Sequence, residues 1–143
     1  MKTLDKENVI GISALLVHAA KIDENYSDHE KKLVKEFIES YLKNENSELI
    51  LKKAEEIENS SNQLLHFTNI IKKNTEEVKI SIIEHLWRII ISDNSVDQYE
   101  SNLMRRVCGL IYFPDKMCAE IKLRLMKSRW HILLKMNVLN VSS

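Results

Sequence analysis

The scarcity of glycine and proline is the feature that most limits what this chain can fold into. Its 143 residues include two glycines and one proline. Tight β-turns and the glycine-rich loops that bind phosphate depend on these residues, so all-β folds and nucleotide-binding loops are disfavoured. With 44% hydrophobic and 29% charged residues, the chain can bury a core and does not have the composition of a disordered segment. We therefore expect one soluble, mostly helical domain.

Apolar residues recur at helical spacing along nearly the whole chain, which predicts an all-α fold. The first helix is expected over roughly residues 5–21. A capping box of Ser27 and Glu30 is predicted to open the second helix. Start signals for the other five are Ser47, Ser60 with Gln63, Asn74 with Glu77, Asp97 with Glu100, and Pro114 in the first turn of the last helix. These signals predict a compact bundle of about seven short helices.

An internal repeat organises this bundle. A shift of 70 residues places residues 9–42 on residues 79–112. Asp23 then falls on Asp93 and Glu30 on Glu100, among several matching apolar positions. Each copy reads as a helix, a loop opened by aspartate, and a second helix with glutamate in its first turn. This pattern favours a bundle built from two related halves.

Both loops of the repeat are rich in oxygen ligands. Residues 23–30 include Asp23 and Glu30, and residues 93–100 include Asp93, Asp97 and Glu100. Neither loop is an EF-hand, because the glycine at the sixth position and the acid at the twelfth are missing. Each loop nevertheless gathers carboxylates at a helix start, an arrangement that suits Ca²⁺, Mg²⁺ or Mn²⁺. The 93–100 loop has one more carboxylate at the matching positions and is predicted to be the better cation site.

The same acids also have a purely structural interpretation. Aspartate or serine followed three residues later by glutamate is a capping box, and acids near helix N-termini are favoured by the helix dipole. In that case the protein would be an interaction module that recruits an unknown protein partner. The two interpretations predict opposite results in a cation titration.

A third and weaker alternative is an enzyme whose metal activates water, and the absence of a histidine cluster near the loops speaks against it. The other residues do not favour a membrane protein or a nucleic-acid-binding protein. His18, His66 and His85 lack ligand spacing and are expected at the core edge or in hydrogen bonds between helices. Cys108 and Cys118 lie ten apart without a second pair, which indicates neither a zinc site nor a disulfide framework and is typical of the cytoplasm. The 21 basic residues balance 21 acidic ones, so the net charge says nothing about a nucleic-acid or membrane partner. No stretch reaches the ~18–20 apolar residues of a membrane span.

At this point the sequence resembles a known family, TerB, the small helical proteins named for bacterial tellurite resistance. Residues 22–30 and 86–107 carry the likeness, because they resemble the family's Ala-Asp-Gly loop followed by an acid in the next helix. The likeness covers roughly residues 9–128 and is closest to the stand-alone TerB-like proteins. It implies a bundle of about seven helices in two halves and a tellurite or stress-response context, and it gives no enzymatic reaction.

The resemblance also implies acidic sites for a divalent metal. Carried over residue by residue, these sites are Asp23 with Glu30, and Asp93 with Asp97 and Glu100. The chain departs from the motif at its glycine, which is Glu24 in one copy and Asn94 in the other. Asparagine replaces glycine at positive φ more readily than glutamate does, so the second site follows the family pattern better.

The expected organisation is a TerB-like domain over residues 1–128 and an apolar, basic extension over residues 129–143. The extension contains Trp130 and several aliphatic residues, and we expect it to dock on this molecule or on a neighbour. The leading function hypothesis is a non-enzymatic cytoplasmic protein that binds a divalent cation through its acidic loops.

Overall fold

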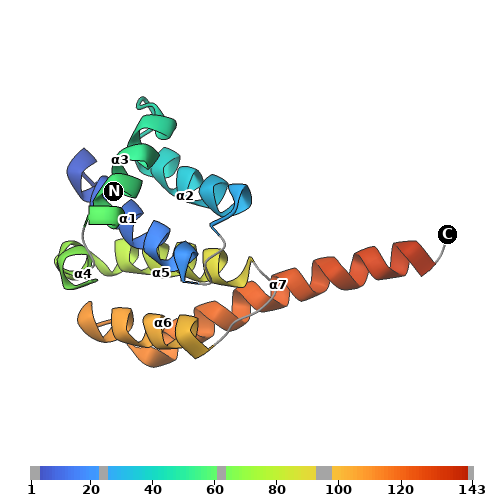
Figure 1. The fold of residues 1–143 in the computed structure, drawn as a ribbon. Coiled ribbons are helices and arrows are strands. Elements are labelled where there is room, and N and C mark those ends of the chain that lie inside the picture. The colour runs from blue at the N-terminus through green and yellow to red at the C-terminus, as the bar shows by residue number, and fades with distance from the viewer. Residues whose placement is uncertain (1–3, 23–25, 61–63, 93–97, 142–143) are drawn as a thin grey trace.

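The computed structural model describes the chain except residues 1–3, 23–25, 61–63, 93–97 and 142–143, and except the side chains of 98–101 and 129–141. The described part contains seven α-helices and no strand (Figure 1). The all-α prediction is therefore confirmed. The helices are α1 (Lys6–Lys21), α2 (Asp28–Tyr41), α3 (Ser47–Ser60), α4 (Leu64–Lys72), α5 (Glu76–Ile91), α6 (Gln98–Leu110) and α7 (Asp115–Val141).

Two of the predicted helix starts are confirmed by side-chain caps. The first helix starts as expected, after Asp5, whose carboxylate accepts a hydrogen bond from the Asn8 N–H at 2.8 Å. The predicted capping box of Ser27 and Glu30 is present at the start of α2. Such caps bind backbone N–H groups that the first turn of a helix leaves without partners.

Two other predicted caps are wrong by one residue, and a third predicted cap lies inside the preceding helix. The cap of α3 comes from Asn46, whose side chain accepts from the backbone N–H of Glu48 at 3.0 Å, and Ser47 is already helical. Thr75, not Asn74, caps α5. Ser60 ends α3 instead of opening α4. Neighbouring polar residues have similar capping ability, so local sequence alone does not select among them.

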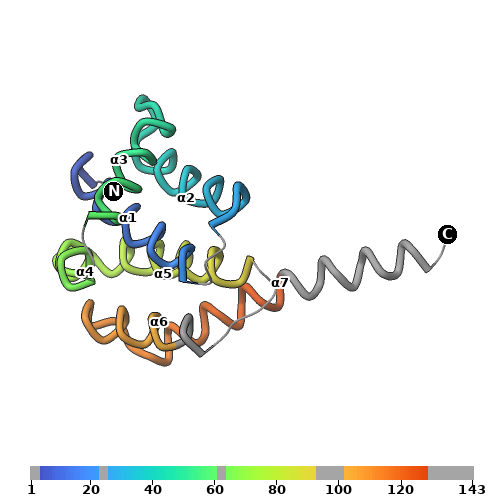
Figure 2. Tube along the Cα trace, viewed as in Figure 1, coloured from blue at the N-terminus to red at the C-terminus, as the bar shows by residue number. Residues whose placement is uncertain are grey.

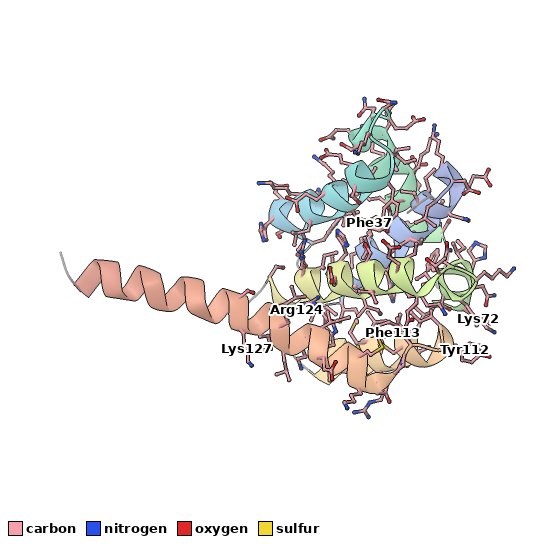
Figure 3. All side chains as sticks on the ribbon, turned by 180° about the vertical axis from the view of Figure 1, so that it is seen from behind. Phe37, Lys72, Tyr112, Phe113, Arg124 and Lys127 are labelled. Atoms are coloured by element: carbon pink, nitrogen blue, oxygen red, sulfur yellow. The ribbon has the colours of Figure 1, made fainter. Side chains whose placement is uncertain are left out.

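Helix α1 lies at the centre of the bundle. Eleven of its sixteen residues are buried, because α2, α3, α4 and α5 all pack against it. Helix α5 lies between α1–α3 on one side and α6 and α7 on the other, a course that the Cα trace in Figure 2 also shows. Phe37, labelled in Figure 3, lies on α2. Its ring contacts that of His85 on α5, with centroids 5.2 Å apart. The helices that precede the two loops of the predicted repeat, α1 and α5, therefore both lie in the centre of the described bundle.

The helix bounds agree with the predicted repeat. Shifting α1 by 70 residues gives 76–91, which are the bounds of α5, and the start of α2 shifts onto the start of α6. The pairs differ in their packing, since α1 contacts α2 extensively whereas α6 packs on α4 and α7. A bundle built from two related halves stays a prediction.

The last helix is longer than the short helix that was expected. Helix α7 has 27 residues and continues past residue 128, so the predicted domain boundary falls inside a helix. Its N-terminal part buries Cys118 and Ile121 in the core. The expected docking of Trp130 and its neighbours concerns side chains outside the described part. None of the helices in that part is long and apolar enough to cross a membrane.

Candidate functional site

Most of the predicted cation ligands lie outside what the structure describes. Asp23, Asp93 and Asp97 are not among the described residues, and Glu100 lies in the first turns of α6 with its side chain likewise undescribed. Glu30 is the predicted ligand whose side chain is described. The geometry of the site is therefore built from Glu30 and from the residues that border the two acidic loops.

Glu30 is a buried carboxylate, with 1% of its surface exposed. Its Oε1 accepts the backbone N–H of Ser27 at 3.0 Å and the Ser27 hydroxyl at 3.1 Å. In return, the Glu30 N–H donates to Ser27 Oγ at 3.2 Å. One oxygen of this predicted ligand therefore caps the N-terminus of α2. This is the role that Glu30 has if the acids are helix caps.

Tyr26, next to this cap, lies among carboxylates from two helices. Burial raises the pKa of its phenol, and the carboxylates of Glu55, Glu30 and Glu58 raise that pKa further. The ammonium of Lys31 lies 5.2 Å from the centroid of the Tyr26 ring. Tyr26 therefore stays a neutral phenol, and the charges around its ring are mixed in sign.

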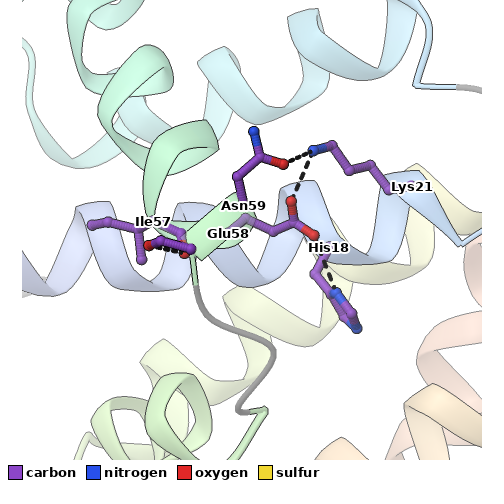
Figure 4. Close-up of polar contacts among 6 residues, drawn as sticks. His18, Lys21, Ile57, Glu58 and Asn59 are labelled. Carbon is purple, nitrogen blue, oxygen red and sulfur yellow. Dashed lines mark hydrogen bonds and ion pairs between the residues drawn. The ribbon is translucent and has the colours of Figure 1, made fainter.

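A second acidic group, unexpected from the sequence, joins α1 to α3 (Figure 4). Lys21 Nζ donates to Glu58 Oε2 at 2.8 Å and to Asn59 Oδ1 at 3.1 Å. His18 Nδ1 lies 3.4 Å from Glu58 Oε1, so the expectation that His18 bonds between helices is confirmed. Glu58 is 8% exposed and is already neutralised by a cation of the chain itself.

His85 is also held by a hydrogen bond, in this case within its own helix. Its Nδ1 lies 2.7 Å from the carbonyl oxygen of Ser81, one turn earlier in α5. Burial lowers the pKa of its imidazole, so the folded protein holds this ring neutral. Within the described residues, no group of three or more histidine, cysteine, aspartate or glutamate side chains is placed to hold a metal ion.

A cavity of about 230 Å³ is lined by residues that lie close to the two acidic loops in the sequence. Its lining includes His29, which precedes Glu30, and Ser92, which precedes the loop 93–100. Arg88 on α5 supplies a positive charge to the wall, and Leu33 and Leu125 supply apolar surface. The lining comes from α2, the end of α5 and α7, and no local sequence signal could have brought these segments together.

A comparison with protein families gives one match. The family model described as Tellurite resistance protein TerB matches residues 10–123, from α1 into α7. This range lies within the one over which the sequence showed its resemblance. No curated protein and no solved structure matches the chain.

Proposed function

The chain belongs to the TerB family, and from this premise we propose that it is a non-enzymatic cytoplasmic protein of a tellurite or stress response that binds a divalent cation. The cation would be Ca²⁺, Mg²⁺ or Mn²⁺, and the proposed ligands are Asp23, Glu30, Asp93, Asp97 and Glu100. The observation that carries the proposal is the cavity between α2, α5 and α7. His29 and Ser92 both line it, so residues next to each acidic loop in the sequence face the same cavity.

The hydrogen bonds of Glu30 make the first loop the weaker cation site of the two. Glu30 Oε1 already accepts two hydrogen bonds from Ser27. It is therefore a weaker ligand for a cation than a carboxylate that caps no helix. Asp93, Asp97 and Glu100 carry three carboxylates, and cation affinity rises with the charge of the ligands. We therefore propose the 93–100 loop as the principal site.

A calorimetric titration of the full chain with each of the three cations tests the proposal. We expect saturable binding that is lost on Asp93→Asn or Glu100→Gln and kept on Glu56→Gln, which removes an exposed charge from α3. Bound cation should also raise the melting temperature by mass action. Absence of binding with all three cations, or equal loss in the Glu56 variant, would overturn the proposal.

The ranking of the two loops has its own test. Asp97→Asn should weaken cation binding more than Ser27→Ala does. Ser27→Ala breaks the capping box and should lower stability by about 1 kcal/mol with or without a cation, so affinity has to be measured below the unfolding transition. Equal losses of affinity in the two variants would contradict the ranking.

The alternative function is an interaction module that recruits a protein partner and uses its acids as helix caps. The capping box of Ser27 and Glu30 favours it. Arg88 favours it as well, because this positively charged residue lines the cavity beside which a cation would have to bind. A chain that binds no cation, yet loses stability on Ser27→Ala, would support this alternative.

A further inference from the structure

A second cavity, of about 330 Å³, is lined by residues from three helices. Trp87 comes from α5, and Met104 and Arg105 come from α6. The N-terminal part of α7 supplies the other lining residues, which are Asp115, Cys118, Ala119 and Lys122. The sequence gave no indication of this cavity, because its charged residues lie on different helices.

A sharp turn brings the N-terminal part of α7 back to α6. Tyr112 takes a left-handed conformation, with φ of 58° (labelled with Phe113 in Figure 3). The Phe113 N–H donates to the carbonyl oxygen of Cys108 at 2.8 Å, and the Tyr112 N–H donates to that of Gly109 at 3.4 Å. These two bonds form a Schellman motif, which ends a helix sharply. Helix α7 therefore packs on α6, and both helices line one cavity.

Three of the lining residues are buried and form the floor of the cavity. Met104 is 1% exposed, Trp87 is 4% exposed and Cys118 is 6% exposed. The indole N–H of Trp87 donates to the carbonyl oxygen of Cys118 at 3.2 Å, which joins α5 to α7. The cavity is therefore part of the packed fold and does not have to form when a ligand binds. Such preorganisation favours binding.

Two cationic side chains border this floor. Lys122 Nζ lies 5.1 Å from the centroid of the Trp87 ring, within the range of a cation–π interaction. Arg105 is exposed on α6. Among the residues that the structure describes, neither cation forms an ion pair with a carboxylate. Asp115, at the start of α7, brings one negative charge to the lining, so positive charge is in excess there.

This combination of groups suits a ligand that has a phosphate at one end and an apolar group at the other. The planar guanidinium of arginine can donate two parallel hydrogen bonds to phosphate oxygens, and lysine adds a compact positive charge. A phosphate monoester carries about −1.5 to −2 charges at pH 7, which matches two cations. The indole of Trp87 and the methyl group of Ala119 offer apolar surface beside them.

We propose that this cavity binds a small organic phosphate. Arg105 and Lys122 hold the phosphate group, and Trp87 and Ala119 contact the apolar part of the ligand. Asp115 weakens the binding, because its negative charge repels the phosphate. This inference does not rest on the proposed cation, since the five acids proposed as its ligands take no part in it.

The test titrates the full chain with phenyl phosphate and measures binding by calorimetry. The buffer contains EDTA, so that no divalent cation bridges the protein and the phosphate. We expect saturable binding at one site per chain. Arg105→Gln and Lys122→Gln should each weaken this binding about tenfold, because each removes a hydrogen bond between charged groups. Asp115→Asn should strengthen it about threefold, because the repulsion is removed.

Two controls separate the cavity from general attraction to positive charge. Arg106→Gln removes the exposed positive charge next to Arg105 but is not part of the lining, so this variant should bind as wild type does. Inorganic phosphate has no apolar part and should bind about tenfold more weakly than phenyl phosphate.

An NMR measurement places the ligand in the cavity. The chain has two tryptophans, and Trp130→Phe leaves the indole N–H signal of Trp87 alone in the proton–nitrogen spectrum. This signal should shift as phenyl phosphate is added, because the Trp87 indole lines the cavity.

Four outcomes would overturn the inference. These are the absence of saturable binding, an equal loss in the Arg105 and Arg106 variants, a Trp87 signal that does not shift, and equal affinities for phenyl phosphate and inorganic phosphate. Circular dichroism shows whether each variant is folded. If Arg105→Gln fails to fold, Arg105→Lys replaces it and should also weaken binding, since lysine keeps the charge but lacks the planar guanidinium.

Discussion

Replacing Glu58 with glutamine tests the ion pair that joins α1 to α3. Glu58 is 8% exposed, and its Oε2 accepts from Lys21 Nζ at 2.8 Å. A hydrogen bond to a charged group contributes about 1.5–3 kcal/mol to stability. The side chain of Lys21 is 32% exposed, so solvent screening reduces this contribution. Glutamine keeps one acceptor but loses the charge, and we expect the free energy of unfolding to fall by about 1 kcal/mol.

Urea denaturation followed by helical circular dichroism measures this loss. For a domain of this size, 1 kcal/mol corresponds to a decrease in melting temperature of about 3–4 °C. The matched control is Glu56→Gln, an exposed position on the same helix, which should stay within about 0.5 kcal/mol of wild type. A double-mutant cycle with Lys21→Met isolates the pair and should give a coupling energy of about 1 kcal/mol.

The reasoning would be refuted in two ways. An equal loss of stability in Glu58→Gln and Glu56→Gln would mean that the pair adds nothing to the packing of α3 on α1. Alternatively, the cycle could give no coupling between Lys21 and Glu58. In that case the loss in the Glu58 variant would come from the glutamate stem or from His18, which lies 3.4 Å from the other carboxylate oxygen.

Two further predictions concern pH and helix α6. Burial lowers the pKa of His85 below its usual 6.5, so its contribution to stability is full above about pH 6.5 and is lost as pH falls towards the lowered pKa. In urea titrations at several pH values, His85→Phe should flatten this decline and the exposed control His66→Gln should not, and equal slopes would contradict the assignment. Gly109→Ala should raise the free energy of unfolding by about 0.5–1 kcal/mol, because no described atom lies within 4 Å of the added Cβ. Gly11→Ala should gain less or lose stability, since its Cβ would lie 2.5 Å from Ile70 Cδ1, and equal gains in the two variants would refute the close packing of α1 on α4.

The helices themselves could be predicted from the sequence. A helix forms from hydrogen bonds between residues four apart, so its apolar stripe and its caps are visible in a short window. This is why the capping box of Ser27 and Glu30 was found, and why the errors at Asn46 and Thr75 are of one residue only. The length of α7 was missed although no glycine or proline follows Pro114 to break the helix, because the domain was ended at residue 128, where the resemblance ends.

The residues of the candidate sites depend on tertiary structure. The contacts of Glu58 with His18 and with Lys21 join two different helices, α3 and α1. The cavity beside His29 likewise needs α2, α5 and α7 together. Which residues meet depends on the angle and rotation at which helices cross, and these are set by the packing of the whole core. The sequence specified each helix and its apolar face, and only the fold decided which polar groups of different helices came into contact.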